Sequence, residues 1–85
     1  MKNIPRIKEV KPLDNYTLEV LFSNGILKKY DMKPIIKKHP VFEDLRYNNL
    51  FKLVHVDCGG YGIAWNDTLD LSEYEIWKNG LESCS

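Results

Sequence analysis

The chain has 85 residues, of which 44% are hydrophobic, and its 12 basic and 12 acidic side chains balance to a formal charge of zero. This length suits one small domain over residues 1–85, with an ordered core at about 4–80, and excludes two domains. No apolar run is long enough to cross a bilayer and the N-terminus lacks a signal peptide, so we expect a cytoplasmic protein without a membrane partner. Cys58 and Cys84 are therefore expected to be reduced thiols.

Three antiparallel strands are predicted before residue 32. The segment RIKEVKPL at 6–13 is rich in β-branched residues, and YTLEVLF at 16–22 alternates apolar and polar side chains with a period of two. The pair Asn24-Gly25 favours a two-residue type I′ turn into ILKKYD at 26–31. With a loop of that length, Val20 faces Lys29, and the three strands form a meander.

The rest of the chain predicts two short helices separated by a β-hairpin. Asp31 suits the free amides of a helix over 32–38, and 41–52 is expected to form one helical turn and a loop. Strands at 53–57 and 61–66 flank a glycine turn, and the last helix begins at Ser72, where Ser72 and Glu75 form a capping box. The predicted fold class is α+β, with an antiparallel sheet of about five strands (meander plus hairpin), two short helices, and the order β-β-β-α-β-β-α.

The stretch DCGGYGIAW at 57–65 holds three of the five glycines. A phosphate-binding loop delivers its amides at a helix start, whereas Ile63-Ala64-Trp65 continues as an extended segment, so the glycines favour a hairpin turn. A zinc site would use His55 and Cys58 with His39 and Cys84, but structural zinc sites have two short-spaced ligand pairs and this chain has one.

Other catalytic patterns are weak. Asp67 and Asp70 are paired carboxylates, yet their neighbours are those of an ordinary turn before a helix. Neither histidine comes with a nucleophile motif. We therefore expect no enzyme activity, no catalytic residue, no cofactor and no metal.

The charges are unevenly distributed along the chain. Residues 1–40 carry nine Lys or Arg and four Asp or Glu, a balance of +5, and residues 41–85 carry three and eight, a balance of −5. The halves either interleave and neutralise one another, or the basic half forms a face for nucleic acid. The candidate nucleic-acid contacts are Lys28, Lys29, Lys33, Lys37 and Lys38.

Aromatic side chains offer candidate contacts to a protein. Trp65 and Trp77 are expected in the core, because large rings are needed to fill a small domain. Tyr47 and Tyr61 lie in polar or glycine-rich surroundings, and Tyr61 follows a tight turn. These two tyrosines are the candidate partner contacts.

Several segments, in this order, resemble the small bacterial family catalogued as domain of unknown function 2442. They are YTLEVLFSNG, YDMKP, PVFEDL, LFKLVHVD, GYGIAW and DLSEYEIW, and the resemblance extends from Pro5 to Trp77. It implies an α+β domain with a curved antiparallel sheet and two short helices. The family has no established activity, so no catalytic residue is carried over. Lys29, at a commonly apolar position, and Cys58 in the turn depart from its pattern.

The resemblance also suggests partners. Some members look like the N-terminal domain of a longer chain that ends in a DNA-binding helix-turn-helix, and this chain is expected to stop before that element. Other members are encoded beside a small protein of an uncharacterised family numbered 4160, which suggests a toxin–antitoxin pair. The leading hypothesis is a non-enzymatic, antitoxin-like domain that binds another small protein. The alternative is a nucleic-acid-binding or regulatory domain, and a homo-oligomer would suit a chain with so small a core.

Overall fold

Seven β-strands and two α-helices follow one another in the computed structural model, which describes residues 4–47 and 49–82, except for the side chain of Cys58. The strands are β1 (Ile7–Leu13), β2 (Thr17–Phe22), β3 (Leu27–Asp31), β4 (His55–Val56), β5 (Gly62–Ala64), β6 (Asp70–Ser72) and β7 (Leu81–Glu82). The helices are α1 (Lys33–Lys38) and α2 (Glu73–Asn79). Short 3₁₀ segments lie at Asp14–Tyr16, Pro40–Arg46, Leu50–Leu53 and Cys58–Gly60.

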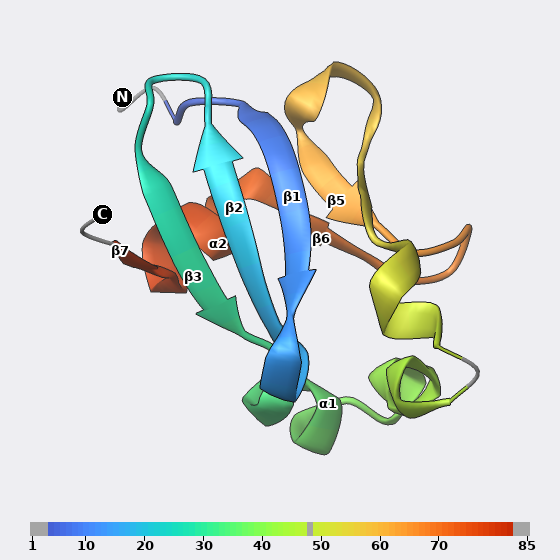
Figure 1. The fold of residues 1–85 in the computed structure, drawn as a ribbon. Coiled ribbons are helices and arrows are strands. Elements are labelled where there is room, and N and C mark those ends of the chain that lie inside the picture. The colour runs from blue at the N-terminus through green and yellow to red at the C-terminus, as the bar shows by residue number, and fades with distance from the viewer. Residues whose placement is uncertain (1–3, 48, 83–85) are drawn as a thin grey trace.

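The strands form two antiparallel sheets. The first has the order β1-β2-β3-β7 and the second the order β4-β5-β6. Figure 1 shows α2 behind the first sheet, β5 beside β1, and β6 passing behind β1 toward α2. The α1 helix and the 3₁₀ segment after it lie at the lower end of the first sheet (Figure 1). This arrangement brings β3, α1, β6 and α2 together around one hollow.

Alternation along β2 determines which face of the first sheet is buried. Leu18, Val20 and Phe22 are fully buried, whereas the residues between them are only partly covered. Each large apolar side chain taken out of water stabilises the fold by about 1.5–3 kcal/mol. From α2, Ile76 is fully buried and the ring of Trp77 packs edge-on against Phe22 at 5.0 Å between centroids. The α2 helix thus covers the apolar face of this sheet.

The hairpin between β2 and β3 differs from the predicted two-residue turn. Leu21 pairs with Leu27, the amide of Phe22 donates to the carbonyl of Ile26, and φ is positive at Gly25 (89°) but not at Asn24. A three-residue loop with one left-handed glycine therefore replaces the type I′ turn, which needs two left-handed residues.

The longer loop shifts the strand register by one residue. Val20 pairs with Lys28, and Lys29 instead pairs with Glu19. Because side chains alternate between faces, this shift puts Lys28 on the core side of the sheet and Lys29 on the other.

The predicted α+β class is confirmed, with the meander, the β4–β5 hairpin and both helices in the expected order. The sequence predicts about five strands and gives no signal for β6 or β7. Each has only two or three residues, too few to show a period of two. The hairpin and β6 form a sheet of their own instead of extending the first one.

The glycine-rich stretch turns a corner between β4 and β5, as predicted. Gly59 and Gly60 have φ of 82° and 77°, and the amide of Gly60 donates to the carbonyl of Asp57 at 2.9 Å. A Cβ on Gly60 would lie 2.6 Å from the carbonyl oxygen of Ile7. Both the left-handed backbone and this close approach to β1 require glycine at position 60.

Candidate interaction groove

An open groove of about 900 Å³ lies between the edge of β3 and the edge of β6. The α1 helix and the 3₁₀ segment Pro40–Arg46 form one end, and α2 with β7 forms the other. Its lining includes two lysines and four aliphatic residues, which are Lys29, Lys38, Ile35, Val41, Leu71 and Leu81. A second hollow, of about 210 Å³, lies beside the turn Asp14–Tyr16 and is much smaller.

The groove is rich in apolar surface. Ile35, Phe42 and Leu71 are half-buried and pack against the core from its walls. Val41 is 47% exposed and Leu81 is 77% exposed, although both are large aliphatic residues. Exposed apolar groups that gather in a concave surface are typical of a binding site rather than of an ordinary surface.

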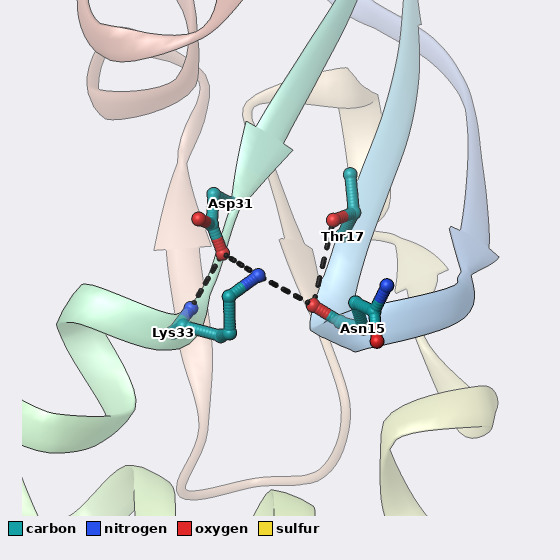
Figure 2. A network of polar contacts seen from close by, with 4 residues as sticks. All are labelled: Asn15, Thr17, Asp31 and Lys33. Atoms are coloured by element: carbon teal, nitrogen blue, oxygen red, sulfur yellow. Dashed lines mark hydrogen bonds and ion pairs between the residues drawn. The ribbon is translucent and has the colours of Figure 1, made fainter.

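A polar network lies beside the groove where β3 meets α1. Asp31 Oδ1 accepts a hydrogen bond from the amide of Lys33 at 2.9 Å and lies 3.0 Å from its Nζ (Figure 2). The same Nζ donates to the carbonyl oxygen of Asn15 at 3.0 Å, next to the hydroxyl of Thr17 (Figure 2). The network joins the turn before β2 to the first turn of α1.

This network also sets the charge state of Asp31. Desolvation by burial raises its pKa, but the amide hydrogen bond and the ammonium of Lys33 outweigh that effect and hold the pKa below 3.8. Asp31 is therefore anionic at neutral pH and is neutralised from within the fold.

A second polar cluster lies on the α2 side of the groove. The Tyr30 hydroxyl donates to Glu75 Oε2 at 2.8 Å, and the amide of Asn79 donates to the same oxygen at 2.7 Å. Burial, followed by the hydrogen bond and the charge of Glu75, raises the pKa of Tyr30 far above 10.0. Tyr30 is thus a fixed hydrogen-bond donor here. Glu75 does not complete the predicted capping box, although Ser72 Oγ accepts from the Glu75 amide at 3.2 Å.

Two of the five candidate lysines make contacts within the fold, and the other three are exposed. Lys28 Nζ lies 4.3 Å from the centre of the Trp77 ring and donates to the Trp77 carbonyl at 2.6 Å. Lys33 is held by Asp31, so both side chains serve the fold. Lys29 and Lys38 are exposed and line the groove, whereas Lys37 is exposed outside it.

The two candidate tyrosines lie apart from the groove. Tyr47 is 61% exposed, as expected of a contact residue. Tyr61 is 55% exposed, but its hydroxyl accepts a hydrogen bond from Arg6 and the Arg6 guanidinium lies 4.4 Å from the centre of its ring. Tyr61 therefore links the glycine turn to the N-terminal segment instead of standing free.

Only two of the four metal ligands considered from the sequence, His39 and His55, have side chains that the structure describes. Within residues 4–47 and 49–82, no three His, Cys, Asp or Glu side chains lie close enough to hold a metal ion. His55 Nδ1 lies 3.2 Å from the carbonyl oxygen of Leu53. Cys84 and the side chain of Cys58 lie outside what is described, so their redox state stays a prediction.

Sequence reasoning did not identify Val41 or Leu81 as contact residues. Val41 begins the segment 41–52 that is predicted as a helical turn and a loop, and Leu81 follows the last predicted helix without any periodic pattern. Both become recognisable only when β7 pairs with β3, through Lys29 and Leu81, and α1 closes the other end.

No helix in the described part of the chain is long and apolar enough to cross a membrane.

Comparison with known proteins gives a family and one structural relative. A family model described as "Protein of unknown function (DUF2442)" matches residues 7–82. A crystal structure of "Putative DNA Binding Protein NE0471 from Nitrosomonas europaea ATCC 19718" is similar, with 27% sequence identity and a TM-score of 0.67. The match covers 80% of this chain but 45% of that one, so this chain spans less than half of its relative. No curated protein matches the chain.

Proposed function

The chain belongs to the DUF2442 family, and we propose that it is a non-enzymatic domain that binds another protein through the groove between β3 and β6. The observation that carries this proposal is the exposure of Val41 and Leu81 in a concave, largely apolar surface. Burial of such side chains by a partner releases them from water, which is the main driving force of most protein association.

The finer proposal is that the protein acts as the antitoxin-like half of a two-gene module. Its partner is then a small protein encoded by the adjacent gene, of the type numbered 4160 that accompanies other family members. A chain of 85 residues buries little apolar surface by itself, so a partner also stabilises it. The surface charge of the groove, with Lys29 and Lys38 at its walls, supplies specificity and a faster association rate.

The test is co-expression of the protein with the product of the adjacent gene, followed by affinity purification and titration calorimetry. We expect a complex with a dissociation constant of about 1 μM or lower, equivalent to about 8 kcal/mol of binding free energy. Failure of the two proteins to associate at that concentration contradicts the antitoxin-like assignment.

Matched variants locate the contact. Val41→Asp and Leu81→Asp place a charge in the groove and are expected to weaken the complex by at least about tenfold. Leu53→Asp is the control, because Leu53 is 60% exposed and lies outside the groove. If Leu53→Asp weakens the complex and the groove variants do not, the contact surface lies elsewhere.

A second candidate function is nucleic-acid binding, favoured by the name of the structural relative. Over half of that relative has no counterpart in this chain, and two of the five candidate lysines are held within the fold. The candidate surface is then Lys29, Lys37 and Lys38. It predicts DNA binding that weakens steeply with salt and is lost in the Lys37→Glu, Lys38→Glu double variant. Unchanged DNA binding in that variant would contradict nucleic-acid binding through this lysine surface.

A further inference from the structure

We propose that the groove receives an extended segment of its partner, with apolar side chains at alternate positions, which lies as an added strand between β3 and β6 and joins the two sheets. This inference rests on the proposed protein-binding function and specifies the conformation and side-chain pattern of the bound segment. It depends on the direction of the backbone groups at the two sheet edges and on the apolar side chains that line the groove.

The edge of β3 is only partly covered. β2 pairs with β3 along its whole length, but β7 pairs only with Lys28 and Lys29. The amide of Met32 donates to the carbonyl of Tyr16, so its backbone faces the β2 side. Because backbone direction alternates along a strand, Asp31 turns its N–H and C=O the other way, into the groove.

The edge of β6 is open in the same manner. The carbonyl of Leu69 accepts from Trp65 and the amide of Glu73 donates to Tyr61, so both residues turn toward the β5 side. The alternation then directs the N–H and C=O of Asp70 away from β5 and into the groove. In the described part of the chain, β6 has no strand on that side.

These two edges favour an extended occupant over a helical one. A peptide strand satisfies backbone donors and acceptors on both of its own edges, and its alternate side chains fill apolar pockets. A helix satisfies its own backbone groups through internal hydrogen bonds. It would therefore bury the N–H and C=O groups of Asp31 and Asp70 without giving them a hydrogen-bond partner. Apolar side chains at alternate positions of the strand would contact the apolar lining residues Ile35 and Leu71.

The charges of the groove do not favour a segment of one sign. Asp31 is ion-paired with Lys33. Glu75 accepts its two hydrogen bonds from Tyr30 and Asn79, which are neutral donors and do not offset its carboxylate charge. Lys29, Lys38 and Asp70 form no ion pair with any described residue. The two lysines and the two carboxylates of Asp70 and Glu75 therefore balance, and polar side chains of either charge suit the bound segment.

The experiment selects peptides from a phage-displayed random library on the immobilised protein. Peptides of about 10 residues span about 33 Å when extended at 3.3 Å per residue, which compares with the 34 Å length of the molecule. We expect selected sequences to alternate apolar and polar residues. A synthetic representative should shift the amide resonances of Asp31 and Asp70 in a ¹H–¹⁵N spectrum.

Backbone methylation tests the strand itself. Two N-methylated versions of the selected peptide block alternate amides, one version for each edge. A strand inserted between two edges loses about tenfold or more in affinity in both versions, whereas a strand on a single edge loses it in only one. Val41→Asp should weaken peptide binding by at least about tenfold, and Leu53→Asp, at an exposed site outside the groove, should not.

Several results would overturn the proposal. They are selected peptides with apolar residues at helical spacing, resonance shifts away from Asp31 and Asp70, tolerance of methylation on either edge, or no enrichment over an unrelated immobilised protein. If the adjacent-gene product still binds in a groove-dependent manner, only the strand inference fails and the proposed function stands. If that product also fails to bind, the proposed function falls with it.

Discussion

The hydroxyl of Tyr30 donates a hydrogen bond to Oε2 of Glu75 at 2.8 Å and so ties β3 to α2 across a helix–sheet contact. Removal of this donor by Tyr30→Phe should lower the free energy of unfolding by about 1–3 kcal/mol, because a charged acceptor loses a partner in a partly buried site. Urea unfolding at neutral pH measures the change. Tyr74→Phe is the control, since Tyr74 is half exposed and its hydroxyl has no bond to a described residue.

The same pair makes stability depend on alkaline pH. The pKa of Tyr30 is raised in the folded protein, so its contribution is complete below the unfolded value of 10.0 and is lost as the pH rises toward the folded value. We expect the wild-type protein to lose stability above pH 10.0 more steeply than Tyr30→Phe does. If the free energy of unfolding falls equally steeply with alkaline pH in the two proteins, Tyr30 is not the group responsible for the loss.

The stabilisation that Asp31 provides depends on pH in the opposite direction, and the change falls at acidic pH. Its folded pKa is lowered, so the stabilisation is present above the unfolded value near 3.8 and disappears as the pH falls through the folded value. The side chain is half exposed, so solvent screening keeps the effect below about 1 kcal/mol. Asp31→Asn should therefore be slightly less stable at pH 7 and equal to wild type in strong acid. Asp67→Asn, at an exposed site without an ion pair to a described residue, is the control in thermal unfolding.

Substitutions at Gly60 and Gly25 distinguish the cost of backbone strain from the cost of steric overlap. Both have positive φ, but a Cβ on Gly60 meets the Ile7 carbonyl at 2.6 Å whereas a Cβ on Gly25 meets nothing within 4 Å. Gly25→Ala should lower the stability by about 1–2 kcal/mol, the cost of a left-handed alanine. Gly60→Ala should lower the free energy of unfolding by clearly more than Gly25→Ala. Equal losses of stability in denaturant unfolding would show that β1 moves away from the new Cβ without an energetic cost.

Arg6 and Tyr61 should be coupled weakly. The guanidinium contacts both the hydroxyl and the ring, but Tyr61 is more than half exposed to water. A double-mutant cycle with Arg6→Ala and Tyr61→Ala should give a coupling energy of about 0.5–1 kcal/mol. In Tyr61→Phe the contact with the ring remains and part of the coupling is retained. A coupling energy of zero would mean that the turn and the N-terminal segment are independent.

Local patterns in the sequence determined the main elements. The alternation over Leu18, Val20 and Phe22 predicts a strand with one buried face, and Ser72 marks the start of the last helix. These signals are local, because a period of two, a helix cap and a left-handed glycine each depend on a few neighbouring residues. The glycine turn at 59–60 and the order of elements followed from the same kind of signal.

Tertiary structure alone decided which side chains line the groove. The three-residue loop at Gly25 shifted the register, so Lys28 covers Trp77 and Lys29 lines the groove. The exposure of Leu81 depends on the pairing of β7 with β3, between residues more than fifty positions apart. Such pairings depend on the summed burial of the whole core and leave no local pattern. The sequence by itself thus determined the elements and the buried face, and the packing of distant segments decided the candidate binding surface.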